Sequence, residues 1–193
     1  LPNYNVSLAE KIIPAADVSE QISLASKEAS GTSNMKLMLN GAITIATLDG
    51  ANVEIRDAVG DENIYIFGLT EAEVYAYYEN KNYSSREVYE TNPIVHRVLN
   101  AFVDGSIPNI EREGQEIVDS LLLYNDEYFL LRDFDAYCKA QARLNQDYQD
   151  ATHWQKCSLI NIANAGTFSA DKTVKQYAED IWQIEPLFAH KGR

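Results

Sequence analysis

The first seventy residues alternate short β-branched runs with short helical patterns, and this alternation constrains the fold more than any other feature. Strand patterns cover residues 18–23, 42–47 and 64–67. Helical patterns lie around them, over residues 6–13, 35–40 and 53–58. Because strands that alternate with helices favour a parallel sheet, the sequence predicts an α/β fold.

The rest of the chain, residues 71–186, has a pattern that predicts helix over almost its whole length. It opens at Thr70, which together with Glu73 forms a capping-box pattern. Apolar residues then recur at helical spacing over 71–80, 85–103, 111–123, 130–149, 151–164 and 171–182. We therefore predict an α/β portion over 1–70 and a helical remainder of the same domain over 71–186. Residues 187–193 lack periodicity and are predicted to be a disordered tail.

Composition and charge exclude several function classes. The 193 residues include 29 acidic and only 16 basic side chains, which gives a net charge of −13. This balance argues against binding to nucleic acid and to anionic membrane surfaces. No apolar run approaches the roughly 18 residues that span a bilayer, and the N-terminus does not resemble a signal peptide.

The cysteines and the first residue bear on where the protein works and on its origin. Cys138 and Cys157 lack the ligand spacing of a metal site and form no disulfide framework, so we predict a reducing, cytoplasmic location and no metal. The chain opens on Leu1 instead of methionine, which suggests that it was cut from a longer protein.

The stretch from Glu28 to Gly41 carries the most chemical information. Gly31 allows a close backbone approach to a ligand, and Thr32 or Ser33 can cap the helix that follows. Lys36 lies one turn further on, on the face that Thr32 occupies. A phosphate on the helix N-terminus and an amine one turn away would suit pyridoxal phosphate. From the spacing alone, such a segment is more often a simple helix cap, and a generic phosphate site is a further alternative.

The literal sequence resembles the α-glucan phosphorylases, the family of glycogen, starch and maltodextrin phosphorylases. The segment 28–42 closely resembles their pyridoxal-phosphate attachment segment. The resemblance extends to 3–15, 47–55 and 172–182, and so covers nearly the whole chain. It implies a fragment from the C-terminal part of the second Rossmann-like domain of a two-domain, GT-B type glycosyltransferase.

The resemblance also assigns roles to individual residues. Lys36 matches the lysine that forms a Schiff base with the cofactor, and Gly31 and Thr32 match contacts to the cofactor phosphate. Tyr4 matches an aromatic residue near the cofactor. The segment of Glu28, Ala29, Ser30 and Gly31 matches the part that holds glucose hydroxyls, with Glu28 as the strongest contact. Lys36 and Glu28 are thus the expected catalytic residues.

The implied reaction cleaves the terminal α-1,4-linked glucosyl unit with inorganic phosphate and gives glucose 1-phosphate. In the family, upstream basic residues help hold the phosphates, and the upstream N-terminal domain completes the cleft. We therefore expect the isolated chain to be inactive and to bind the cofactor weakly or not at all, whereas the parent is expected to be a homodimer. The sequence does not separate glycogen from maltodextrin as the substrate.

Three serine and alanine positions depart from the family pattern. Ser26, Ser33 and Ala46 stand where many members have glycine. Ser33 lies beside the expected cofactor phosphate, so this departure matters most at the sequence level. Because serine is small and caps helices well, we expect little effect unless the glycine needs a positive φ.

Two other hypotheses about the function of the whole chain remain open. The chain could be a non-catalytic glucan-binding or assembly module that keeps the fold without the activity. It could also belong to a similar glycosyltransferase that uses a nucleotide sugar, although Lys36 in its full motif argues against this.

Two further sequence features are interpreted as structural. The cluster of Tyr75, Tyr77 and Tyr78 is better explained by packing than by a carbohydrate platform. Asp49 and Gly50 are interpreted first as a turn, although in the family this run faces the cofactor loop.

Overall fold

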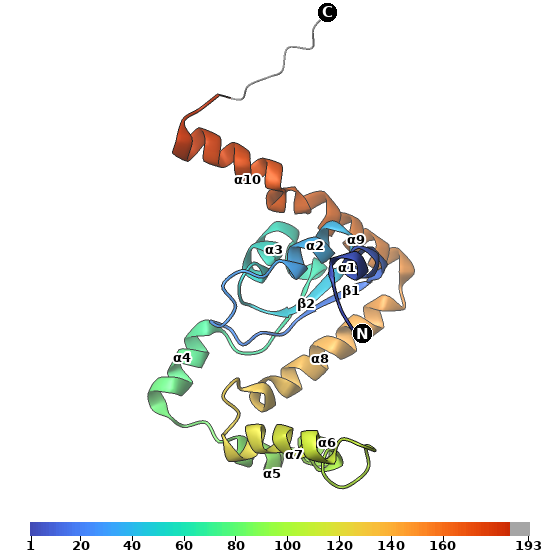
Figure 1. Cartoon of the computed structure of the whole chain (residues 1–193), viewed down its shortest axis with the longest axis vertical. Coiled ribbons are helices and arrows are strands. Elements are labelled where there is room, and N and C mark those ends of the chain that lie inside the picture. Colours follow the sequence, from blue (N-terminus) through green and yellow to red (C-terminus); the bar gives the residue numbers. More distant parts are fainter. Residues whose placement is uncertain (186–193) are drawn as a thin grey trace, which may run out of the picture.

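A three-stranded parallel sheet lies at the centre of the structure, a computed structural model that describes residues 1–185 (Figure 1). Its strands are β1 (Val18–Gln21), β2 (Ile43–Thr47) and β3 (Tyr65–Phe67), and they are ordered β1-β2-β3. The three predicted strands are therefore confirmed, as is their parallel arrangement. The fold is a helix-rich α/β fold with a small parallel sheet.

Strand β2 is the buried centre of this sheet. Parallel pairing aligns Val18 with Ile43 on one side of it and Ile45 with Tyr65 on the other. All five β2 residues are buried, which is the usual state of a central parallel strand with both faces covered. The β-branched side chains of this run suit such a pleated, closely packed position.

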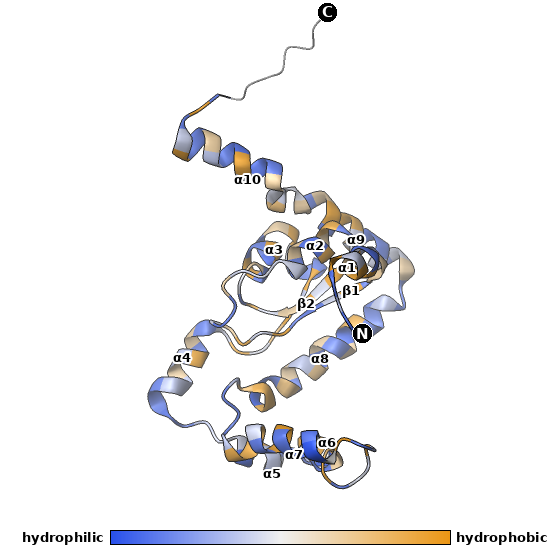
Figure 2. Ribbon diagram, in the orientation of Figure 1, coloured by the Kyte–Doolittle hydropathy of each residue, from blue (hydrophilic) through white to orange (hydrophobic). Residues whose placement is uncertain are grey.

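Helices cover both faces of the sheet. One face is covered by α2 (Ser33–Leu39) and by α3 (Asn52–Val59), which leads through the turn η2 (Asp61–Asn63) into β3. The other face packs on α8 (Leu130–Tyr148), and α9 (Ala151–Asn164) contacts α2, α3 and α8. Figure 2 shows hydrophobic and hydrophilic residues alternating along α8, as expected for a helix with one buried side. The core between the sheet, α8 and α9 consists of Ile43, Ile45, Tyr65, Phe67, Ala140, Leu144, Trp154 and Cys157.

A second group of helices lies at the carboxyl-terminal side of the sheet. It contains α4 (Glu71–Asn80), α5 (Ser85–Thr91), α6 (Pro93–Ala101) and α7 (Glu111–Val118), which continues into the π-helical turn η3 (Asp119–Leu123). These helices have their own core, made of Val95, Leu99, Leu121 and Leu131. Helix α8 begins in this group and ends against the sheet, so it joins the two cores (Figure 1).

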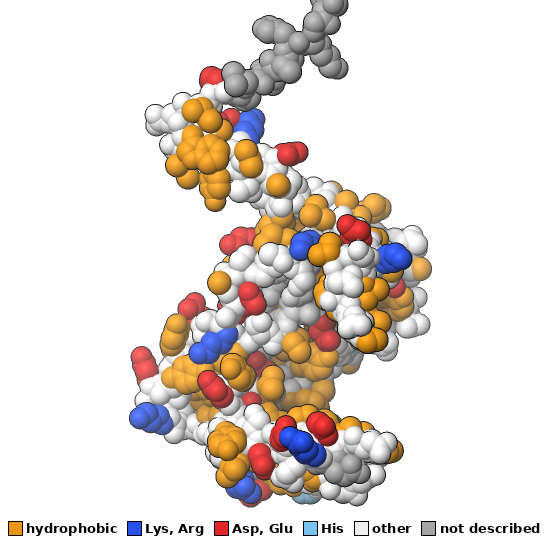
Figure 3. Space-filling model, in the orientation of Figure 1, with side chains coloured by type: hydrophobic (Ala, Val, Ile, Leu, Met, Phe, Trp, Pro, Cys, Tyr) orange, Lys and Arg blue, Asp and Glu red, His pale blue; other side chains and the backbone are white. Residues whose placement is uncertain are grey.

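The described chain begins and ends in helices at the edge of this body. Helix α1 (Val6–Ile12) and the turn η1 (Ile13–Ala15) precede β1, and η4 (Ala165–Phe168) follows α9. Helix α10 (Ala170–Gln176) and the π-helical turn η5 (Tyr177–Trp182) then project away from the body and bury no residue (Figure 1). Figure 3 shows a patch of hydrophobic side chains on this projecting helix.

The helix ends show where sequence patterns succeed and fail. The capping box at Thr70 is confirmed, because its hydroxyl accepts from the Glu73 N–H and the Glu73 carboxylate accepts from the Thr70 N–H. The single helix predicted over 85–103 is wrong, because the chain breaks at Asn92 between α5 and α6. Pro93 disfavours a helical conformation in the residue before it, and the Asn92 side chain caps the new helix instead.

The predicted tail, residues 187–193, lies outside the described residues. Within residues 1–185, no helix is both long and apolar enough to cross a membrane.

Candidate functional site

The segment from Glu28 to Lys36 leaves the carboxyl end of the β1 region and runs into α2. Helix α2 begins at Ser33, with Thr32 at the N-cap position. The predicted side-chain cap is wrong, because no side chain caps α2. Thr32 has φ −127° and ψ −24°, which is not the extended backbone of a capping residue, and the Ser33 hydroxyl donates to the Gln21 side chain at 3.2 Å. The N-cap residue therefore supplies no side-chain cap, and in the first turn the Met35 N–H donates to the Asn34 side-chain oxygen at 2.9 Å.

Gly31 holds a backbone conformation that favours glycine. Its φ is +82°, and a Cβ built on it would lie 3.1 Å from the Asn34 side-chain nitrogen. Asn34 is buried, and its amide donates to the Ser30 carbonyl at 3.3 Å and to the Asn52 side chain at 3.0 Å. The turn before Lys36 is thus fixed from inside the protein.

Asp49 holds the part of the segment that carries Glu28. Its buried carboxylate accepts from the backbone N–H groups of Ser26 at 3.0 Å, Lys27 at 3.2 Å and Glu28 at 2.7 Å. A carboxylate that accepts three N–H groups fixes a loop strongly, because each charge-assisted bond is stronger than a neutral one. Asp49 is a supporting residue that the sequence prediction missed, since the turn interpretation of Asp49 and Gly50 gave its side chain no role.

Gly50 adds a close backbone approach to the same loop. Its φ is +50°, and a Cβ there would lie 2.5 Å from the Ser30 carbonyl oxygen. The next residue, Ala51, donates its N–H to that carbonyl at 2.7 Å. The residues after β2 therefore brace the segment after β1. The sequence indicated this contact, because the resemblance implies that the Asp-Gly-Ala-Asn run of residues 49–52 faces the cofactor loop.

The expected ligand-facing side chains lie on an exposed rim. Glu28, Ala29, Ser30, Thr32 and Lys36 are all exposed, and Gly31 is half-buried. The chain brings them together along one loop and the first turn of one helix. Tyr4 lies before α1 with 64% of its surface exposed, and within residues 1–185 it makes no hydrogen bond to this rim.

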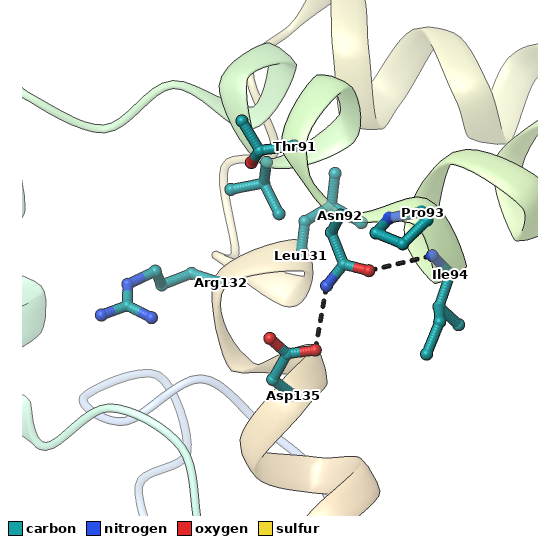
Figure 4. Close-up of a pocket in the computed structure, with 8 residues that line it drawn as sticks. Thr91, Asn92, Pro93, Ile94, Leu131, Arg132 and Asp135 are labelled. Carbon is teal, nitrogen blue, oxygen red and sulfur yellow. Dashed lines mark hydrogen bonds between the residues drawn. The ribbon is translucent and has the colours of Figure 1, made fainter.

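Three cavities in the described chain lie away from this rim. One, of about 470 Å³, lies where the junction of α5 and α6 meets α8 (Figure 4). There the Asn92 amide donates to Asp135 at 2.9 Å and its oxygen accepts from the Ile94 N–H at 3.0 Å, while Arg132 extends away from both. A second, of about 490 Å³, lies beside α4, and a third, of about 230 Å³, lies between the sheet and α8. None of the three is lined by residues 28–36.

The described groups with shifted pKa values lie outside this rim, and several of them surround the start of α8. Burial raises the pKa of Asp133, an effect that the Leu69 N–H and the Arg132 guanidinium oppose. Burial and a hydrogen bond to the Asp126 carboxylate raise the pKa of Tyr83. These shifts follow from packing and hydrogen bonding and mark no acid or base on the exposed rim.

The rim residues suit pyridoxal phosphate in their chemistry. An amine one turn from an uncapped helix start can meet an aldehyde while the N–H groups and the Thr32 hydroxyl meet a phosphate. Because α2 has only seven residues, its N-terminus by itself would be a weak anion site. Within residues 1–185, no group of three His, Cys, Asp or Glu side chains could hold a metal ion.

A small parallel sheet with helices on both faces, and a braced polar loop after its first strand, defines a helix-rich α/β domain. The carbohydrate phosphorylase family model matches residues 1–184. The chain belongs to the carbohydrate phosphorylase family, as the sequence resemblance indicated.

Known relatives agree with this assignment. The chain is 52% identical over 187 residues to a glycogen phosphorylase of Bacillus subtilis, a match that covers 97% of this chain and 23% of the relative. It is 45% identical over 190 residues to the liver form of Homo sapiens, with 96% and 22% covered. A glycogen phosphorylase of Haemophilus influenzae is 45% identical over 187 residues, with 97% and 23% covered. The chain thus spans less than a quarter of the length of these relatives.

Proposed function

We propose that this chain is part of a cytoplasmic, pyridoxal-phosphate-dependent α-1,4-glucan phosphorylase of the GT-B type. The parent enzyme would release glucose 1-phosphate from glucan ends with inorganic phosphate. The observation that carries the proposal is the braced segment from Glu28 to Lys36, which is fixed by Asp49 and Asn34 and presents its polar groups outward. Family membership and 52% identity to a glycogen phosphorylase support it.

Each rim residue has a defined part in this proposal. Lys36 attaches the cofactor, which supplies a phosphate group that can exchange a proton with the substrate phosphate when bound. The Gly31 backbone and the Thr32 hydroxyl hold that phosphate at the uncapped start of α2. Glu28 accepts hydrogen bonds from glucose hydroxyls and so orients the sugar, because its backbone is anchored by Asp49 at 2.7 Å.

The rim forms only one wall of an active site. Its side chains are exposed, and positive groups that could balance two phosphates are few beside a net charge of −13. We therefore propose that the isolated chain is inactive and binds the cofactor weakly or not at all. The exposed apolar face of α10 and η5, which includes Val174, Tyr177 and Trp182, fits a helix that packs on the remainder of the homodimeric parent.

The two alternative functions predict different roles for Lys36. A non-catalytic glucan-binding or assembly module would keep the fold without using Lys36. A transferase that uses a nucleotide sugar would need no lysine-bound cofactor at all. Labelling of Lys36 therefore separates the proposal from both.

The test is borohydride reduction of the full-length protein that contains this chain, followed by peptide mapping. We expect the reduced cofactor on Lys36 and its loss in Lys36→Arg. Lys27→Arg is the matched control, because Lys27 lies on the same loop but is placed over the Tyr78 ring, 5.3 Å from its centroid. Label on another lysine, or none on Lys36, would defeat the cofactor assignment.

A second measurement addresses the isolated chain. We expect it to show far less than one equivalent of cofactor absorbance after purification with added pyridoxal phosphate. Near-stoichiometric absorbance would overturn the claim that the missing wall is needed for binding.

A further inference from the structure

An aromatic cavity opens beside α4, outside the segment from Glu28 to Lys36. It has a volume of about 490 Å³ and lies between the end of α4 and the loop that precedes α8. This volume falls within the range of roughly 300–1,000 Å³ typical of small-molecule sites. Five of the nine side chains that line it are aromatic: Tyr77, Tyr78, Tyr83, Tyr124 and Phe129.

The aromatic wall is built around Phe129. Its ring centroid lies 4.7 Å from that of Tyr83, 5.3 Å from that of Tyr78 and 5.4 Å from that of Tyr77. Phe129 itself is buried, whereas Tyr124 keeps 72% and Tyr78 keeps 36% of its surface exposed. The cavity therefore has an apolar floor, and Tyr124 is its most exposed ring, whereas Lys27 lies over the ring of Tyr78.

Unusual backbone conformations gather around the same cavity. Four residues that line it, none of them glycine, have positive φ: Lys81 at 50°, Asn125 at 57°, Asp126 at 48° and Phe129 at 52°. Each such residue costs on the order of 1–3 kcal/mol, so a cluster of four persists only where other contacts enforce it.

The Asp126 carboxylate supplies much of this enforcement. It is buried and accepts from the Tyr83 hydroxyl at 2.7 Å and from the N–H groups of Leu130 at 3.0 Å and Leu131 at 2.8 Å. The Asp126 carboxylate therefore fixes the loop and the start of α8 through these three hydrogen bonds. The fixed loop also carries Tyr124 and Glu127, which line the cavity and are exposed.

The polar side of the cavity disfavours anions. Lys81 and Glu127 carry opposite charges, and the buried Asp126 carboxylate adds a second negative charge to the lining. An anion would meet more negative than positive charge there. A neutral sugar ring, with one apolar face and hydroxyl groups at its edge, matches both sides of the cavity. Its apolar face can stack on a tyrosine ring, and its hydroxyl groups can form hydrogen bonds with Lys81 and Glu127.

We propose that this cavity is a second carbohydrate site, which binds glucosyl units apart from the Glu28–Lys36 segment. The identity of the sugar as glucose rests on the proposed function. Tyr77 and Tyr78 then serve both packing and binding, which revises the purely structural interpretation of the tyrosine cluster. Figure 3 shows hydrophobic side chains with charged groups between them over α4.

The cavity also contacts the base of the candidate active-site loop. Phe129 shares a core cluster with Leu24 and Ala25, which directly precede that loop. Lys27, the residue before Glu28, lies over the ring of Tyr78. A glucan held in the cavity would therefore lie beside the segment that orients the sugar in the proposed reaction.

The test is titration of the ¹⁵N-labelled 193-residue chain with glucose and with maltoheptaose, followed by NMR. We expect saturable shifts at residues 77–83 and 124–129, with glucose alone sufficient if one ring is recognised and maltoheptaose required if a longer chain is. Tyr124→Ala should weaken binding roughly three- to tenfold, the loss of one stacking contact, whereas Tyr124→Phe should keep most of it. Tyr75→Ala is the matched control, because Tyr75 is half exposed on α4 but does not line the cavity.

A second measurement uses the full-length protein, so that the result does not depend on the stability of the isolated chain. Equilibrium dialysis should detect two classes of maltoheptaose site, of which Tyr124→Ala removes one. A single class unaffected by Tyr124→Ala, or equal shifts with inositol or inorganic phosphate, would overturn the proposal. Lys36→Arg separates the two proposals, because it abolishes borohydride labelling and should leave binding at this cavity unchanged.

Discussion

Ser26 and Ser33 both depart from the family pattern, but their backbones differ. Ser26 has φ +81°, a left-handed conformation that favours glycine, and its N–H donates to Asp49. Ser33 instead lies in the first turn of α2, with helical backbone. The expectation that the Ser33 departure matters most is therefore better applied to Ser26, where the positive φ is found.

This difference predicts opposite effects of the same substitution. Ser26→Gly should stabilise the protein by about 0.5–1 kcal/mol, because glycine adopts the left-handed conformation without the steric cost of a Cβ. Ser33→Gly, the matched control, should destabilise it by a similar amount, because glycine is unfavourable in a helix. Urea unfolding of both variants measures the difference, and equal signs would contradict the structural explanation.

At the scale of elements, Asp133 connects the end of β3 to α8. Its carboxylate accepts from the Leu69 N–H at 2.9 Å, just after β3, and a Cβ at Gly68 would lie 2.7 Å from its other oxygen. The side chain is shielded from solvent by this close approach, and burial raises its pKa. Arg132, Asp126 and Glu73 are the other charged groups that act on it.

The raised pKa predicts a pH dependence of stability. Because the folded state binds the Asp133 proton more tightly than the unfolded chain, this group's contribution falls as pH rises through its folded pKa. Asp133→Asn keeps an acceptor for Leu69 and removes the titration. We expect the unfolding free energy of D133N relative to the native chain to increase from about pH 4 to about pH 7.

Urea unfolding at several pH values checks this expectation. Asp133→Ala provides the comparison, because it also removes the acceptor and should leave the Leu69 N–H unsatisfied at every pH. A relative stability of D133N that falls as pH rises would show that burial does not govern this carboxyl group.

On the scale of the whole molecule, the described chain divides into a packed body and a projecting end. Helix α9 contributes Trp154, Cys157 and Asn161 to the interior, whereas α10 and η5 bury no residue. The exposed side chains there include Ile181 and Trp182. The stability of this chain by itself should therefore depend on α9 and hardly at all on the last helix.

Truncation tests this division. Removing the residues after Ser169 should change the unfolding free energy by only about 0.5 kcal/mol, since exposed positions contribute little. Removing the residues after Asp150, which deletes α9, should abolish cooperative unfolding because it opens the main core. A loss of about 2 kcal/mol or more from the first truncation would mean that α10 packs on the body in solution.

The sequence by itself determined the strand and helix order, the capping box at Thr70 and the family. These features depend on local patterns, namely the hydrophobic periodicity, the β-branched runs and the sequence of residues 28–42. They can therefore be recognised without the tertiary structure. Only the tertiary structure showed that Asp49 braces the Glu28 loop, that Ser26 is the strained serine and that the aromatic rings of α4 surround Phe129. Those facts depend on residues more than twenty positions apart in sequence, because packing and hydrogen bonds across the chain fix the loop conformation and the cavities.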